Sequence, residues 1–189
     1  RGSLEQVAQH GREFAAEVER RLGAPLRPLG PVTAASYRQI QLQLDRAVTR
    51  EELQQRVAKA GKRTSYAASK FIQQIDAGRP LPTTVPCPVQ TWCFGDDLAM
   101  VFLGGEAVAE YSLRLRRELD SRRLWVNAYA NGVPCYLASK RMFAEGGTEV
   151  DGSMDYYGWP TRLSIHTEDQ VIGTVHQLLP SGFGSRDGR

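Results

Sequence analysis

A strand–helix–strand pattern in the middle of the chain constrains its fold more than any other feature. Residues 98–103 form an apolar run that ends at Gly104-Gly105, residues 106–119 have helical spacing, and residues 124–130 form a second apolar run. A helical crossover of this length favours two parallel strands joined with right-handed chirality. The residues just past both strand ends then lie at one edge of the sheet, where open α/β sheets hold their ligands.

Further elements are expected around this unit. Residues 89–94 and 98–103, separated by Gly95-Asp96-Asp97, predict an antiparallel hairpin, in which the turn accounts for both aspartates. Ile40, Leu42 and Leu44 alternate with glutamines and predict a strand with one wet face. Helices are expected over residues 4–22, 50–59, 65–76, 139–145 and from Thr167 onward, with capping boxes at Thr49/Glu52 and Thr167/Gln170. We expect an α/β fold: a mixed sheet with a βαβ unit flanked by helices, plus an N-terminal helical segment.

Proline spacing suggests how the chain is divided. Four prolines between residues 80 and 88 predict an extended linker. We therefore expect a helical segment with one strand over residues 1–85, packed on an α/β core over 86–180. Residues 148–166 read as irregular and aromatic, and residues 181–189 as a disordered tail.

Charge and composition exclude several classes of function. The 189 residues carry a net charge of +3, and their charges are scattered, so no nucleic-acid footprint is visible. The arginines between residues 114 and 123 read as a solvated helix end. No apolar run reaches the roughly 18 residues of a transmembrane helix. The three cysteines read as small buried hydrophobes, and pairing of Cys135 with His166 or His176 as nucleophile and base is disfavoured.

Glu106 and Tyr136 are the candidate site residues at the sheet edge. Glu106 is expected to begin a helix, where the helix dipole favours the ionised carboxylate. It reads either as a metal ligand or as a plain first-turn glutamate, and Tyr136 either as a ligand or as an aromatic plug. The three histidines show no metal-binding spacing, so the chain does not supply a three- or four-ligand zinc site by itself.

The order of several short motifs resembles the neutral (non-lysosomal) ceramidase family, most of all its shorter bacterial members. The resemblance is good over about 86–180 and looser over 4–85. The segments that carry it are residues 88–92, 94–98, 103–106, 131–139 and 144–147.

The resemblance implies a zinc ion held by two histidines, a glutamate and a tyrosine, with Glu106 and Tyr136 at the last two positions. The zinc-activated water attacks the amide of an N-acylsphingosine. Thr148 stands where the family often has a tyrosine near the scissile group, so oxyanion support at that position is in doubt. The resemblance also implies that both histidines belong to an N-terminal catalytic region absent here, as is a C-terminal immunoglobulin-like domain.

Two functional hypotheses follow. The first is a fragment of a zinc-dependent amidohydrolase that acts on a lipid amide, inactive as an isolated chain and needing zinc only in the intact protein. The second is a non-catalytic ceramidase-like binding or assembly module, favoured by Thr148 and the aromatic run Tyr156, Tyr157 and Trp159. Secretion or a periplasmic location is a further expectation from the resemblance. For a fragment we also expect self-association, or a mobile loop within 132–165.

Overall fold

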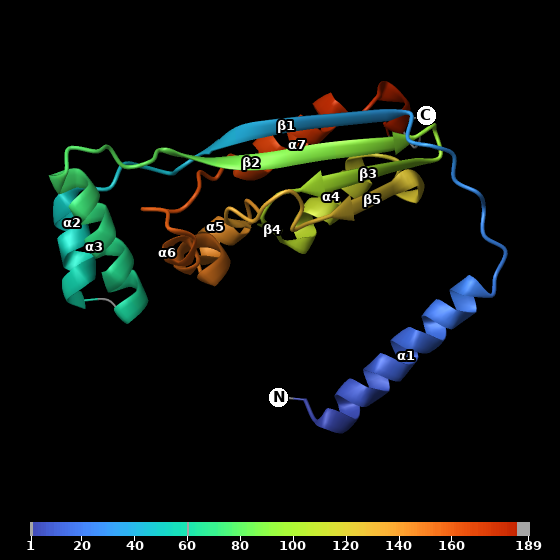
Figure 1. Ribbon diagram of the computed structural model, residues 1–189, viewed down its shortest axis with the longest axis horizontal. Helices are drawn as coiled ribbons and strands as arrows, with labels where there is room; N and C mark the ends of the chain where they lie inside the picture. The colour runs from blue at the N-terminus through green and yellow to red at the C-terminus, as the bar shows by residue number, and fades with distance from the viewer. Residues whose placement is uncertain (1, 60, 185–189) are drawn as a thin grey trace. The chain divides into compact units, whose positions relative to one another are not determined.

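A four-stranded mixed sheet organises the chain from Pro31 onward (Figure 1). The computed structural model describes residues 2–59 and 61–184. The sheet has the order β1-β2-β3-β5, with antiparallel β1/β2 and β2/β3 pairs and a parallel β3/β5 pair. Its strands are β1 (Ala34–Gln43), β2 (Thr84–Phe94), β3 (Leu98–Leu103) and β5 (Leu124–Asn127). The predicted α/β class, hairpin and parallel crossover are all confirmed.

Strand β2 begins within the segment that the prolines suggested was a linker. Pro86 and Pro88 pair with Gln41 and Gln39 of β1. A proline lacks the amide hydrogen, so it fits a strand only where that hydrogen has no ladder partner. The two prolines are two positions apart, so their nitrogen atoms point to the same edge of β2. Pairing with β3 begins only at Val89, so neither nitrogen faces a partner strand that needs its hydrogen. The boundary expected between residues 85 and 86 therefore falls inside a strand.

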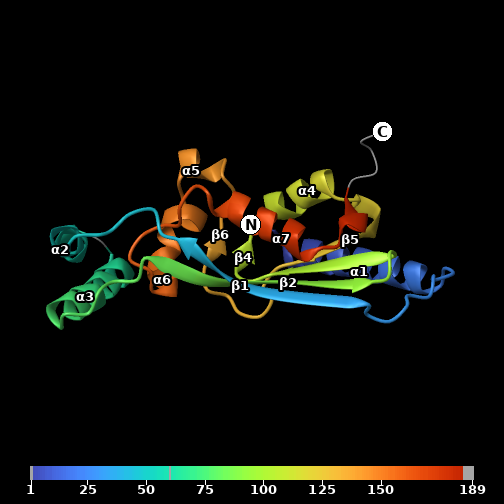
Figure 2. The same cartoon turned by 90° about the horizontal axis from the view of Figure 1, so that it is seen from above.

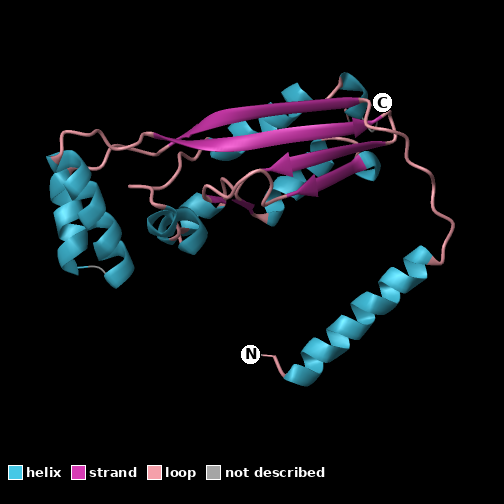
Figure 3. Ribbon diagram, viewed as in Figure 1, coloured by secondary structure: helices cyan, strands magenta, loops and turns pink. Residues whose placement is uncertain are grey.

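Helices α4 (Ala109–Glu118) and α7 (Thr167–Leu178) cover one face of the sheet (Figures 2 and 3). Apolar side chains at alternate strand positions meet the apolar stripes of both helices. The largest fully buried side chains here are Leu42, Val85, Val89, Val101, Leu103, Tyr111, Leu115, Val171, Ile172 and Val175. The predicted capping box at the start of α7 is wrong, because His166 is the N-cap and the buried Thr167 hydroxyl has no hydrogen-bond partner.

A helical hairpin forms a second, smaller hydrophobic cluster. It consists of α2 (Arg50–Lys59) and α3 (Lys62–Asp76), which enclose Leu53, Ala67, Ala68 and Phe71. The predicted capping box is confirmed: the Glu52 amide donates to the Thr49 hydroxyl at 3.2 Å, and the Thr49 amide to the Glu52 carboxylate at 3.0 Å. The Thr64 hydroxyl donates to Asp155 at 2.6 Å and ties this hairpin to the segment that follows residue 148.

The first helix, α1 (Leu4–Leu22), belongs to a separate unit, residues 1–30. Ser3 and Gln6 form a capping box at its start, and none of its residues is buried. The division of the chain between Gly30 and Pro31 thus differs from the one expected at 85/86. Within the described residues, no helix is long and apolar enough to cross a bilayer.

The chain is also ordered near its end and in the aromatic segment. Residues 181–184 were expected to belong to a disordered tail. The structure instead has a 3-10 turn, η3 (Ser181–Phe183), with Phe183 buried in the main core. Residues 185–189 lie outside the described part. The aromatic stretch, expected to be irregular, contains a π-helical turn, η2 (Thr148–Gly152), and α6 (Met154–Tyr157).

Candidate functional site

Two glycines after β3 allow the chain to pass against its neighbours. A Cβ at Gly104 would lie 2.5 Å from the Pro88 ring, and one at Gly105 would lie 2.6 Å from the Cys135 carbonyl oxygen. Gly105 also has φ +83°, in the left-handed region that favours glycine. Both positions therefore require glycine, and the turn sets the next residue, Glu106, beside the loop that follows β5.

Glu106 and Tyr136 are direct neighbours in a small parallel sheet. Strands β4 (Glu106–Ala107) and β6 (Tyr136–Leu137) pair with Glu106 opposite Tyr136, and the Glu106 amide donates to the Cys135 carbonyl at 2.9 Å. The crossover geometry predicted this approach across 30 positions. The predicted helix start at Glu106 is wrong, because Glu106 is in β4 and α4 begins at Ala109. The two-residue strand is too short to show a periodic pattern in the sequence.

Three tyrosine hydroxyls surround the Glu106 carboxylate. Tyr129 donates to Oε2 at 2.7 Å, and Tyr157 donates to Oε1. Hydrogen bonds from Tyr157, Tyr136 and Tyr129, in that order of size, lower the pKa of Glu106. The ionised carboxylate is thus stabilised by phenol donors, and not by the helix dipole that the sequence suggested.

The same contacts hold the phenols in their neutral form. Donation to Glu106 is the largest cause that raises the pKa of Tyr136 to about 12, and Glu149 adds a like-charge effect. Burial, followed by the bond to Glu106, raises the pKa of Tyr157, and the bond to Glu106 raises that of Tyr129. At neutral pH the three tyrosines are therefore proton donors around one anion.

Tyr129 was not predicted as a site residue. The sequence suggested that the second parallel strand continues to Ala130, but β5 ends at Asn127 and Tyr129 has φ 56°. A tyrosine in the left-handed region is uncommon and is held by its surroundings. Here its amide donates to the Gly105 carbonyl at 3.0 Å. The available sequence signal was the position of Tyr129, just past the end of the second parallel strand.

Thr148 belongs to η2, a turn that lies next to strand β6. Thr148 is exposed, and its side chain lies over Gly152 within the π-helical turn. Within the described part of the chain, no hydrogen bond joins it to Glu106 or Tyr136. Tyr157 of α6, which belongs to the aromatic run noted in the sequence, donates to the carboxylate, and its ring packs edge-on against Tyr136 at 6.4 Å.

The cysteines and histidines do not form a second centre. Burial raises the pKa values of Cys87 and Cys135 to about 12, which supports the reading of buried hydrophobes and leaves no activated thiol. His176 is bound to Glu118 at 2.7 Å. Among residues 2–59 and 61–184 there is no group of three His, Cys, Asp or Glu side chains able to hold a metal ion.

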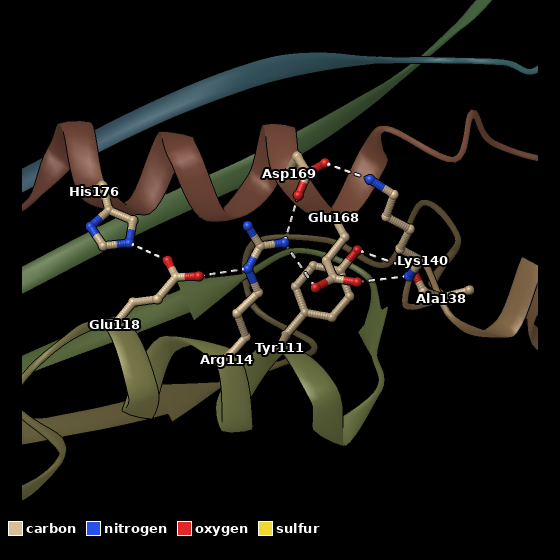
Figure 4. A network of polar contacts seen from close by, with 8 residues as sticks. All are labelled: Tyr111, Arg114, Glu118, Ala138, Lys140, Glu168, Asp169 and His176. Atoms are coloured by element: carbon tan, nitrogen blue, oxygen red, sulfur yellow. Dashed lines mark hydrogen bonds and ion pairs between the residues drawn. The ribbon is translucent and has the colours of Figure 1, made fainter.

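A polar network fixes the segment that follows β6 (Figure 4). Glu168 of α7, whose side chain is 10% exposed, accepts from Arg114 at 2.9 Å and from the Lys140 amide at 2.7 Å. The Tyr111 hydroxyl donates to the Ala138 carbonyl at 3.2 Å. Residues 138–140 are therefore anchored to both α4 and α7, which holds β6 in register with β4.

The pair of oxygens fits part of a zinc site. Glu106 and Tyr136 lie directly opposite each other in the β4/β6 pair, so their side chains leave the same face of this small sheet and can approach one ion. Zinc in proteins is held by about four ligands, so this pair would make up half of the set.

Comparison of the chain with protein families, with characterised proteins and with solved structures finds no match.

Proposed function

We propose that Glu106 and Tyr136 are two of the zinc ligands of an amidohydrolase similar to neutral ceramidase. The observation that carries this proposal is their side-by-side register in the parallel β4/β6 pair, which places both side chains on one face. A carboxylate and a phenol oxygen are suitable zinc ligands once the phenol has lost its proton. The substrate class, an N-acyl amide such as N-acylsphingosine, rests on the resemblance of the motifs.

Each residue of the site has a role that follows from its contacts. Glu106 is ionised and ready to bind a cation, while Tyr136 must lose its proton first. Tyr157 and Tyr129 hold one carboxylate oxygen each and so fix the direction of Glu106. Zinc bound here would supply an activated water and polarise the amide carbonyl. In the free chain Tyr136 keeps its proton at neutral pH, because its pKa is raised to about 12.

Two ligands are insufficient for a catalytic zinc site. The remaining ligands, two histidines by the family resemblance, would come from another polypeptide segment. The chain alone is accordingly expected to be inactive and to bind zinc weakly. Hydrolysis of the amide would therefore need an intact protein that contains both this chain and the segment with the remaining ligands.

Titration calorimetry with Zn²⁺ tests the ligand assignment. Glu106→Gln and Tyr136→Phe should each weaken zinc binding at least about tenfold. Glu145→Gln is the matched control, because Glu145 is exposed on the nearby α5 (Met142–Glu145) and pairs with Arg141. Tight, stoichiometric zinc binding that survives Glu106→Gln would refute the assignment.

A non-catalytic ceramidase-like binding or assembly module is the second candidate. The observation that favours it is Thr148, which stands where the family often has a tyrosine and makes no hydrogen bond to Glu106 within the described residues. An intact protein that binds zinc through Glu106 and hydrolyses no N-acyl amide would support this candidate over the first.

A further inference from the structure

The face of the main sheet opposite α4 and α7 carries no charged side chain. The four strands contain one charged residue, Arg38, and its guanidinium donates to Gln177 of α7 on the helical side. The side chains on the opposite side are aromatic, aliphatic or amide. This uncharged face includes Tyr37, Gln39 and Gln41 of β1, Gln90 and Trp92 of β2, Met100 and Phe102 of β3, and Trp125 and Asn127 of β5.

The strand register arranges these side chains in rows across the sheet. Trp92, Met100 and Trp125 are consecutive partners in one row. The next row runs from Tyr37 through Gln90 and Phe102 to Asn127. Large aromatic groups remain accessible, with Trp125 56% and Tyr37 54% exposed. A sheet face in contact with water normally carries charged and polar side chains. A face made of aromatic, aliphatic and amide side chains is typical of a sheet packed on another layer.

We propose that this uncharged face packs against the same face of a second copy of the chain. In a two-fold dimer each side chain near the axis meets its own copy, so a charged group there would meet a like charge. Amide side chains donate and accept at once, so Gln39 and Gln41 along β1 can pair with the same residues of the second copy, while the Gln90 side chain already accepts from Asn131 at 2.8 Å. The arrangement of side chains therefore suits self-recognition.

The size of the face is near the lower end of what a stable dimer needs. Four strands of these lengths, spaced about 4.8 Å apart, cover roughly 500 Å² in projection. Side-chain relief makes the accessible area larger than its projection, and a standard interface buries about 800 Å² per partner. Two such sheets would stack about 10 Å apart, with helices on both outer sides.

Sedimentation velocity over a concentration series tests the dimer. The wild-type chain should dimerise in the micromolar range. Trp125→Lys and Gln39→Lys should each raise the dissociation constant at least about tenfold, because each would bury an unpaired charge. Gln39 is exposed in a strand and already polar, so its substitution leaves the fold of the single copy intact. Circular dichroism checks that both variants are folded.

Phe14→Lys is the matched control, because Phe14 is a 76% exposed aromatic residue on α1 and lies outside the uncharged face. It should leave the dimer unchanged. A wild-type chain that stays monomeric at the highest concentration overturns the proposal and indicates a different cover for the face. A dimer that Phe14→Lys dissociates, while Trp125→Lys and Gln39→Lys do not, overturns it as well.

Discussion

Replacing Gly105 by alanine perturbs the one turn on which the candidate site depends. The new methyl carbon would lie 2.6 Å from the Cys135 carbonyl oxygen, which is a backbone atom and cannot rotate away. The residue would also be forced into the left-handed region at φ +83°. Strand β6 must then move away from β4, and the hydrogen bond from the Glu106 amide to Cys135 weakens.

The magnitude follows from these two effects. The left-handed conformation costs a non-glycine residue roughly 1–2 kcal/mol, and overpacking against a fixed neighbour costs about 1–3 kcal/mol. We expect Gly105→Ala to lower the free energy of unfolding by roughly 2–5 kcal/mol. For a folded unit of this size, that corresponds to a melting temperature lower by about 5–15 °C.

Urea unfolding monitored by circular dichroism measures the change, and Gly173→Ala is the matched control. Gly173 lies inside α7, where an added methyl group meets no atom within 4 Å. Alanine there should stabilise the helix by about 0.5–1 kcal/mol. A free energy of unfolding of Gly105→Ala within about 0.5 kcal/mol of the wild type would refute the reasoning, because moving β6 would then cost nothing.

Two further predictions concern the groups around β6. Glu168→Gln should destabilise the chain by roughly 2–4 kcal/mol in urea unfolding, because it removes the charge that pairs with the partly buried Arg114, and an unchanged midpoint would contradict this. The pKa of Tyr136, about 12, should fall toward its usual 10 in Glu106→Gln, as read from phenolate absorbance. Because the folded-state pKa is raised, the stability that Tyr136 contributes is present below pH 10 and lost between about pH 10 and 12; a pKa unchanged by Glu106→Gln would contradict the assigned cause.

The parallel crossover could be predicted from the sequence because its signal spans some thirty residues. Apolar runs, a glycine pair and helical spacing all agreed on the same topology, and that topology brought Glu106 to Tyr136. Handedness and strand direction are global constraints, so small errors in element boundaries did not disturb them. The predicted approach of Glu106 to Tyr136 is confirmed, although the predicted helix start at Glu106 is wrong.

The details that could not be predicted depend on tertiary contacts. Pro86 reads locally as a strand breaker, and it is tolerated because β3 does not extend alongside it. Phe183 stands in a tail rich in glycine and serine. Its buried ring under Arg123, the Arg123 bond to the Gly182 carbonyl at 2.8 Å and the Asp120 amide bond to the Phe183 carbonyl at 3.1 Å order the segment. Tyr129 lies in a left-handed conformation that its own side chain disfavours, and the Gly105 carbonyl holds it there.

The electrostatic state of the cluster connects the site to the proposed chemistry. The phenol hydroxyls that donate to Glu106 stabilise its carboxylate as an anion and occupy its oxygens, so a cation would have to compete with these hydrogen bonds. A zinc ion held by both Glu106 and Tyr136, as proposed, would displace hydrogen bonds to Glu106 and take Tyr136 as phenolate, which releases one proton. The high pKa of Tyr136 in the free chain makes that step costly at neutral pH, and further ligands would have to supply the missing binding energy. For the zinc site proposed above, tight binding would therefore require the rest of the ligand set.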